Sequence, residues 1–315
     1  MYTMGEDFGK KGDAMILTIT LNPCVDNTFW VDDWDSLPVK TERQSGGKGI
    51  NVARVLTNLS VPCLALAPAG GKNGALLREL CQSERVPLVP YPIRGETRDV
   101  DTWVRRRDLE QRVDVHPSPE MTREECAGFE DLALSLLDRA RAVAVCGSAC
   151  CERAAQAGRR ILEAAKERGV FTVLDSNKTA LAVCSEAKPD LIKPNQKELA
   201  QLMGRDVAPE EEEEACEALL DRGIGSVLLS MGAGGAVFRS RGSQPVRAAA
   251  PRVETVNAVG SGDSFLAAWL HAWTAGASSR RALEWACAAG AANAAVFPAA
   301  RVTRREIQEQ AGFSL

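Results

Sequence analysis

Residues 257–273 read NAVGSGDSFLAAWLHAW, a glycine-rich turn followed directly by an apolar helical pattern. The large apolar side chains of this segment recur at spacings of three and four, so they share one face of a helix. Gly260 and Gly262 bracket Ser261 just before that helix, where a tight turn points several backbone N–H groups at one spot. The segment therefore predicts a buried helix whose N-terminus can receive an anion.

Asp263 lies in the first turn of this helix, beside the predicted anion site. A carboxylate there could take the proton from an attacking hydroxyl, while the amides of Gly260–Gly262 stabilise a phosphoryl group in transfer. The alternative is that Ser261 or Asp263 merely caps the helix. The segment by itself favours neither interpretation.

Short apolar runs alternate with helical patterns along most of the chain. The expected strands are 15–21, 63–67, 142–146, 171–174, 191–192 and 226–229. The expected helices are 50–59, 73–83, 122–139, 153–168, 196–203, 210–222, 262–275 and 278–296. This alternation predicts an α/β fold in which helices cover both faces of a mainly parallel central sheet.

Two stretches, about 25–45 and 90–116, interrupt the alternation and are richer in charge, Thr and Pro. We expect them to form a small β-sheet beside the main one, able to close over a site as a lid and exclude water. Residues 1–14 are polar and Gly-rich, so a flexible N-terminal tail is expected before a single domain at 15–315.

The bulk composition argues against several classes of protein. A net charge of −4 gives no global basic field, so nucleic acid is not an expected partner. No apolar run approaches the length of a membrane span, so no membrane partner is expected either. The ten cysteines include no CxxC pair and the chain has only two histidines, which favours free thiols over a zinc site and predicts a reducing, cytoplasmic location.

Two glycine-rich segments are candidates for ligand contact. Residues 46–51, GGKGIN, open a predicted helix, and their backbone and the Asn51 amide could hold a polyol; the alternative is a flexible loop with a solvated lysine. The spacing excludes a P-loop. Residues 230–235, SMGAGG, follow a predicted strand and fit either nucleotide contact or a plain hairpin.

Residues 193–199, KPNQKEL, also follow a predicted strand, and Pro194 is typical of a helix start. Asn195 and Glu198 would face the same side of the first turn, where they could hold water around Mg²⁺, an ion that prefers oxygen ligands. Taken alone, the segment favours the alternative, in which these two side chains cap the helix.

Polar and basic residues also stand where a ligand could reach them. Asp26 comes shortly after the first strand, and ligands of parallel sheets gather at the carboxyl ends of strands. Arg98 and Arg105–Arg107 bring positive charge to the expected lid, and arginine suits phosphate through its fork of donors. The alternative for 105–107 is a row of solvated strand residues.

Taken in order from about residue 15 to 300, these segments resemble the ribokinase-like (PfkB-type) carbohydrate kinases. NPCVD at 22–26 and GGKGINVAR at 46–54 are most similar to the phosphosugar branch, which includes 1-phosphofructokinase and tagatose-6-phosphate kinase. The resemblance implies a three-layer sandwich with a small β-sheet lid, which often also pairs two subunits into a homodimer.

The resemblance also implies ATP and Mg²⁺ as cofactors, a small phosphosugar as substrate, and a role for each matching residue. The catalytic positions match Asp263, as the base, and Gly260, Ser261 and Gly262, as the anion hole. The substrate-binding positions match Asp26, Gly46, Gly47, Lys48, Asn51 and, for the substrate phosphate, Arg98. The ATP-binding positions match Lys193, Asn195, Ser230, Gly232, Gly235 and Asn293, with Glu198 on the Mg²⁺ side through water.

Two departures from the family pattern leave the acceptor open. The substrate-side loop at 147–152 reads GSACCE where relatives commonly have GSLPPG, and DSNK at 175–178 lacks a glycine that relatives usually carry. We expect ATP-dependent phosphorylation of a ketohexose phosphate, most simply fructose 1-phosphate to the 1,6-bisphosphate. The alternatives are tagatose 6-phosphate or fructose 6-phosphate as acceptor, and a sugar or nucleotide sensor without catalysis.

Overall fold

A computed structural model describes residues 14–315, so the predicted tail lies outside the described residues except for Ala14. The strands are β1 Met15–Thr20, β2 Cys24–Val31, β3 Lys40–Gly46, β4 Cys63–Ala69, β5 Leu88–Pro92, β6 Arg98–Arg105, β7 Gln111–Val115, β8 Ala140–Gly147, β9 Phe171–Ser176, β10 Leu191–Ile192, β11 Ser226–Ser230, β12 Ala236–Ser240 and β13 Val246–Ala248. The α-helices are α1 Lys48–Asn58, α2 Gly71–Ser83, α3 Arg123–Leu136, α4 Glu152–Glu167, α5 Lys178–Ser185, α6 Gln196–Met203, α7 Glu212–Asp221, α8 Ser261–Thr274, α9 Ser279–Ala294 and α10 Arg304–Ala311.

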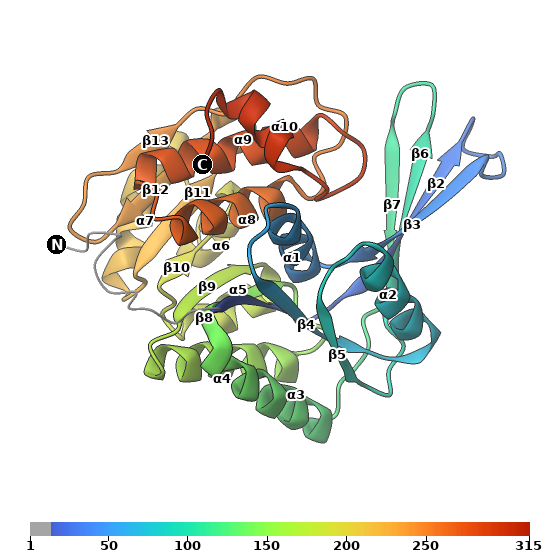
Figure 1. Cartoon of the computed structure of the whole chain (residues 1–315), viewed down its shortest axis with the longest axis horizontal. Coiled ribbons are helices and arrows are strands. Elements are labelled where there is room, and N and C mark those ends of the chain that lie inside the picture. The colour runs from blue at the N-terminus through green and yellow to red at the C-terminus, as the bar shows by residue number, and fades with distance from the viewer. Residues whose placement is uncertain (1–13) are drawn as a thin grey trace.

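The larger sheet has nine strands in the order β13-β12-β11-β10-β9-β8-β1-β4-β5. Neighbouring strands are parallel except at β12, which runs antiparallel to both its neighbours. Helices α1, α8, α9 and α10 pack on one face, and α3 to α7 pack on the other (Figure 1). Both faces of the central strands are therefore buried, which explains their nearly continuous apolar sequence and confirms the predicted three-layer α/β fold.

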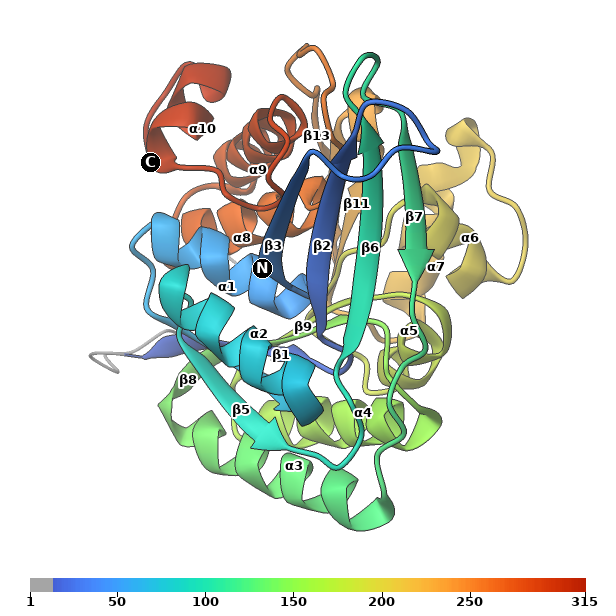
Figure 2. The ribbon, with the colours of Figure 1, turned by 90° about the vertical axis from the view of Figure 1, so that its right-hand side faces the viewer.

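The smaller sheet has the order β3-β2-β6-β7 and stands beside the main body (Figure 2). It is the small β-sheet expected from the stretches 25–45 and 90–116. One boundary differs from the prediction, because residues 90–92 belong to β5, which pairs with β4 at the edge of the larger sheet. We call this smaller sheet the lid.

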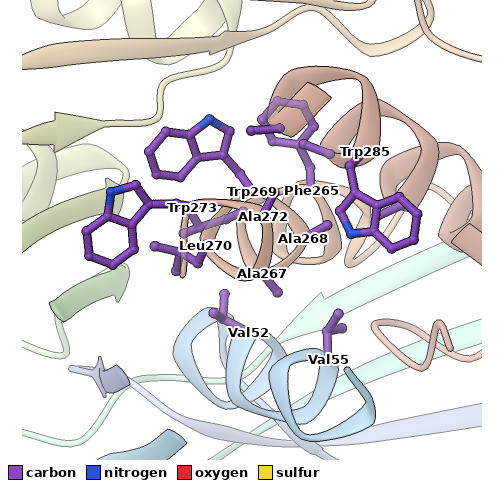
Figure 3. Packing of buried hydrophobic residues seen from close by; sticks show 14 of the residues in the cluster. Val52, Val55, Phe265, Ala267, Ala268, Trp269, Leu270, Ala272, Trp273 and Trp285 are labelled. Carbon is purple, nitrogen blue, oxygen red and sulfur yellow. The ribbon is translucent and has the colours of Figure 1, made fainter. Parts of the chain in front are cut away.

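The core between α1 and α8 fixes how these two helices lie against each other (Figure 3). Val52 and Val55 of α1 face small side chains of α8 such as Ala267, and all three are fully buried. Trp269, which is 1% exposed, lies farther from α1. A fully buried aliphatic side chain contributes about 1.5–3 kcal/mol, so this contact holds the N-termini of α1 and α8 at a defined separation.

Candidate active site

The loops that follow the strands of the larger sheet meet the N-termini of α1 and α8 along one edge. β9 ends next to Asp175, β10 leads to Lys193, and β11 ends at Ser230. Segments far apart in the sequence converge here because the carboxyl ends of parallel strands lie on the same edge of a sheet. Most of the predicted site residues belong to this edge or to the lid strands above it.

The glycine turn before α8 has the conformation that the sequence predicted. Gly260 is the residue before the helix, with a φ of 80°, and a Cβ added to it would stand 2.8 Å from the Ala300 nitrogen. Since the N-cap is a glycine, neither Ser261 nor Asp263 caps this helix, and the capping alternative is not realised. The first amides of a helix have no partner within it, so the turn presents donors to a ligand.

Asp263 is the third residue of α8 and is only 5% exposed. Its Oδ2 accepts a hydrogen bond of 2.7 Å from the Asn51 amide on α1. Burial raises the pKa of Asp263 to about 6, against the lowering effect of the nearby Lys48 ammonium. The carboxylate is thus ionised at neutral pH yet more basic than an exposed aspartate, which suits a general base.

Two lysines and a buried carboxylate lie next to Asp263. Lys48 Nζ stands 2.9 Å from Asp175 Oδ1 and 3.5 Å from Glu198 Oε1, and Lys193 Nζ stands 3.3 Å from Asp175 Oδ1. Burial alone would lower the pKa of Lys48, but the carboxylates of Asp175, Glu198 and Asp263 raise it well above its usual value. Lys48 therefore stays positively charged beside the anion site.

Asp175 was not predicted as a site residue, although it stands at the end of a predicted strand. Its side chain is fully buried, and its Oδ2 has no hydrogen-bond partner among the described residues. A carboxylate at the carboxyl end of a central strand was the signal that could have identified it.

Asn195 and Glu198 form the capping arrangement that their segment favoured when taken alone. Asn195 Oδ1 accepts from the Glu198 amide and Glu198 Oε2 accepts from the Asn195 amide, both at 2.9 Å. The second carboxylate oxygen, Oε1, faces Lys48. Glu198 thus caps α6 with one oxygen and presents the other to the charged residues of the site.

The predicted sugar-binding residues lie where β2 and β3 of the lid meet α1. Asp26 Oδ1 accepts a hydrogen bond of 3.1 Å from the Cys24 thiol, and burial raises the pKa of Asp26. A Cβ on Gly46 would come within 2.4 Å of Asp26 Oδ2, so any larger residue there would displace the Asp26 carboxylate. Gly47, with a φ of 111°, is the residue before α1 and directs Lys48 and Asn51 toward Asp175 and Asp263.

Arg98 begins β6 and lies next to Cys24 of β2 in the lid. Its Nη2 is 3.5 Å from the Asn22 carbonyl oxygen, while its buried Nε has no hydrogen-bond partner among the described residues. Arg105–Arg107 instead pair with carboxylates such as Asp32 and Asp108; only Arg105 belongs to a strand, while Arg106 and Arg107 are exposed in the turn after β6.

A pocket of about 500 Å³ adjoins the glycine turn of α8. Its lining includes Ser230, Gly232 and Gly235 from the predicted nucleotide side together with Ser261 and Gly262. The pocket also has an apolar wall that the sequence did not predict, formed by Ala250, Pro251, Val253, Phe265, Cys287 and Ala291. A flat apolar ring could lie against this wall while its phosphates reach the start of α8.

Asn293, predicted among the ATP-binding residues, lies behind the glycine turn. It is fully buried and does not line the pocket. Its Nδ2 donates to the Val259 carbonyl and to Ser261 Oγ, and its Oδ1 accepts from the Ala300 amide. Since both polar atoms of its side chain are bonded to protein, Asn293 supports the glycine turn from behind, next to Ser261 of the pocket lining, and its predicted place among the ATP-binding residues stays a prediction.

All ten cysteines of the chain lie within the described residues. All ten cysteines are free. Residues 14–315 contain no cluster of three or more His, Cys, Asp or Glu side chains arranged to hold a metal ion directly. In the same range, no helix is both long enough and apolar enough to cross a membrane.

Comparison with known proteins identifies the family. The model of the pfkB family of carbohydrate kinases matches residues 12–300. Phosphofructokinase-2 from Escherichia coli, in complex with substrates and products, is similar at 26% identity with a TM-score of 0.86, covering 95% of this chain and 98% of that one. A phosphofructokinase-like protein from Staphylococcus aureus is similar at 27% identity with a TM-score of 0.79, covering 95% and 97%. A possible 1-phosphofructokinase from Thermotoga maritima, at 21% identity with a TM-score of 0.80 and coverage of 95% and 97%, shares the fold.

The chain therefore belongs to the PfkB family of carbohydrate kinases and is a phosphotransferase with a hydroxyl group as acceptor.

Proposed function

We propose that this kinase transfers the γ-phosphoryl group of ATP to a ketohexose phosphate, with fructose 1-phosphate as the preferred acceptor. The main observation in favour of a phosphorylated acceptor is the state of the Arg98 side chain. It forms no ion pair with any described carboxylate, its Nε lacks a partner, and its charge acts on the nearby Asp26. A guanidinium with unused donors beside a polyol-binding carboxylate suits the phosphate end of such a substrate.

In this proposal Asp263 accepts the proton of the attacking hydroxyl while the hydroxyl oxygen bonds to the γ-phosphorus and ADP leaves. The amides at the start of α8 stabilise the negative charge on the transferred group. Lys48, held by Asp175, places a fixed positive charge within range of the base. The pocket beside Gly232 and Gly235 would hold the rest of ATP, which kinases of this family use.

Mg²⁺ is the expected partner of ATP, and the charged residues suit it. Asp263, Asp175 and Glu198 outnumber the lysines by three to two, and Asp175 Oδ2 is buried without a hydrogen-bond donor in the described chain. Glu198 would hold the ion through water, since Mg²⁺ keeps several water ligands. Bound there, the ion would neutralise charge on the ATP phosphates.

A screen of ADP release tests the acceptor. Fructose 1-phosphate, fructose 6-phosphate, tagatose 6-phosphate and the free sugars are compared at equal concentration, and fructose 1-phosphate should give the highest kcat/KM. Arg98→Met should raise KM for the phosphosugar by about 10- to 100-fold, the usual worth of a charge-assisted hydrogen bond. Arg94→Met removes the same charge from an exposed neighbour and should change little. A response to free sugars only would overturn the phosphosugar proposal and leave the kinase assignment intact.

Fructose 6-phosphate is the second candidate because a structure of phosphofructokinase-2 from Escherichia coli in complex with fructose-6-phosphate is similar to this chain at 25% identity. The atypical loop at 147–152 bears on the choice, since Ser148 Oγ accepts a hydrogen bond of 3.3 Å from Asn22 beside Arg98. A protein that binds sugar phosphates yet releases no ADP with any acceptor would be a sensor.

We also propose a homodimer formed through the lid. Val113 and Val115 alternate along β7, so they share one face of the lid, and they are 51% and 61% exposed. An exposed apolar surface of this kind suits a partner subunit. Light scattering should give twice the chain mass, and Val113→Asp with Val115→Asp should give monomers; a monomeric parent protein would contradict the proposal.

A further inference from the structure

Arg54 is a buried charged residue on α1 that lies one turn after Asn51. It is 2% exposed, and the apolar residues Val52, Val55 and Leu56 surround it in the sequence of the helix. A buried arginine destabilises the fold unless its donors are hydrogen-bonded and its charge is paired. The partners of the Arg54 guanidinium therefore indicate why an arginine stands at this position.

One end of the Arg54 guanidinium is tied to the body of the protein. Its Nε and Nη2 donate to Glu84 Oε2 at 3.1 Å and 2.8 Å, and Nη2 also donates to Ser45 Oγ at 2.7 Å and to the Ser45 carbonyl. Glu84 in turn accepts from the Ser45 amide and hydroxyl. Arg54 is thus held between the end of α2 and the last residues of the lid strand β3.

The other end of the guanidinium faces the active site. Arg54 Nη1 donates to Asn51 Oδ1 at 2.7 Å, and Asn51 Nδ2 donates to Asp263 Oδ2 at 2.7 Å. Arginine can only donate, so the oxygen of the Asn51 amide must face it and the NH₂ group must face Asp263. Without Arg54 the amide could rotate by half a turn and place its oxygen against the carboxylate, which repels it.

We propose that Arg54 is a positioning residue: by fixing the orientation of the Asn51 amide, it holds the Asp263 carboxylate in place and favours its ionised form. This rests on the proposed role of Asp263 as the base. The effect runs through Asn51, since Arg54 makes no hydrogen bond to Asp263 itself among those of the described residues.

The other charged groups around Asp263 come from different elements. They are Lys48 on α1, Asp175 at the end of β9 and Lys193 after β10. None of these three is bonded to Arg54 in the described chain, so a conservative change at Arg54 leaves them in place.

The test measures the pKa of Asp263 in the protein without substrate. Aspartate carboxyl groups are labelled with ¹³C, the Asp263 signal is assigned by its loss in Asp263→Asn, and the pH is varied. Arg54→Lys keeps the charge and the pairing with Glu84 but lacks the second arm of the fork. Because a hydrogen bond to the ionised form lowers the pKa of a carboxylate, we expect Arg54→Lys to raise the pKa of Asp263 by about half to one unit.

Two further variants separate positioning from simple stabilisation. Glu84→Gln weakens the anchor but leaves the Arg54–Asn51 hydrogen bond, so it should lower the stability of the fold without moving the pKa of Asp263. In an Asn51→Ala background, Arg54→Lys should produce no further shift. If Arg54→Lys does not fold, the pKa of Asp263 is measured in the same way in the double variant Arg54→Gln/Glu84→Gln, which removes both buried charges together. An unchanged pKa in Arg54→Lys, or an equal shift in the Asn51→Ala background, would overturn the proposal.

Turnover distinguishes this proposal from the proposed function. With any acceptor that the parent protein phosphorylates, Arg54→Lys should lower kcat about 3- to 10-fold, leave KM for ATP unchanged, and move the acid limb of the kcat profile upward. If no phosphosugar is an acceptor, the proposed function fails while the titration still decides the role of Arg54.

Discussion

Replacing Asp263, the proposed base, by asparagine should make this protein more stable while abolishing most of its activity. Burial raises the pKa of Asp263 from 3.8 to about 6, so the folded state binds this proton more tightly than the unfolded chain does. The free energy of unfolding therefore falls as pH rises from 3.8 to about 6 and levels off above that window. At about 1.36 kcal/mol per pKa unit, the ionised Asp263 costs the fold about 3 kcal/mol at pH 7.

Asp263→Asn removes that cost without creating a cavity. The amide has the shape of the carboxylate, and its oxygen can still accept the hydrogen bond from Asn51 Nδ2. We expect the variant to be more stable than the parent by about 1–3 kcal/mol at pH 7 and by only about 0.5 kcal/mol near pH 4, where the folded parent carries the proton and the unfolded chain carries it about 40% of the time. Turnover should fall by about a hundredfold or more, the usual worth of a general base.

Urea unfolding at several pH values between 4 and 7.5 measures the free energy of unfolding of variant and parent. Their difference at each pH removes the contributions of the other titrating groups, which the two proteins share. Asp206→Asn, at an exposed position, is the matched control and should change the unfolding free energy by less than about 0.5 kcal/mol. An Asp263→Asn protein that is less stable than the parent at pH 7 would refute the electrostatic reasoning. One that keeps near-normal turnover would refute the assignment of the base.

Two glycines and a histidine allow further predictions. Gly260→Ala should cost about 1–3 kcal/mol of stability and most of the turnover, because its φ is 80° and the new Cβ would meet the Ala300 nitrogen at 2.8 Å. Gly262→Ala, whose Cβ meets only Lys193 Nζ at 3.5 Å, should fold normally yet raise KM for ATP; equal melting temperatures for the two variants would contradict this. Burial, and to a smaller extent the charge of Arg304, lowers the pKa of His271 from 6.5 to about 4. The contribution of His271 to the free energy of unfolding should therefore be fully present above pH 6.5 and decline as the pH falls from 6.5 to 4. His271→Gln should show a smaller decline in urea unfolding between pH 7 and 5, and an unchanged decline would exclude His271 as its source.

The larger part of the fold was predictable because its elements carry strong periodic patterns. The strand at 191–192 and the helix at 196–203 have the predicted bounds. The helix expected at 122–139 ends as an α-helix at 136, where a short 3-10 turn takes over, a change that hydrophobic spacing does not register. The strand at 246–248 was missed because three residues give too little periodicity. The helix at 178–185 is as long as the one at 196–203, but it lacks the proline and the capping box that mark the start of that helix.

The helix at 304–311 was also missed, although a signal for it was present. Thr303 and Glu306 form a reciprocal capping box, with the Thr303 amide donating to Glu306 at 2.7 Å. A Thr followed three residues later by Glu is the sequence pattern of such a start. The pattern was outweighed by the many charged residues of this segment, which hide its narrow apolar face.

The residues of the candidate site fall into two groups, those in local turns and those whose contacts lie far away in the sequence. Asp263, Gly260 and Lys48 belong to local turns whose chemistry can be inferred from a few neighbouring residues. The place of Arg54 depends on Glu84, 30 residues away, and that of Asn293 on how α9 lies behind the turn at Gly260. Contacts of this range follow from the assembled fold, so sequence patterns gave no indication of them.

The role that we propose for Asp263 consequently depends on packing that touches no ligand. Asn51 and Asp263 are 212 positions apart, and their hydrogen bond of 2.7 Å exists only because α1 and α8 keep a fixed separation. The small Ala267 and the valine Val52 set that separation in the core (Figure 3). Enlarging Ala267 would push the helices apart, since protein interiors are close-packed and have no spare volume. A shift of even one ångström would break the hydrogen bond to Asp263, so the core between these helices is as much a part of the candidate active site as the residues that line it.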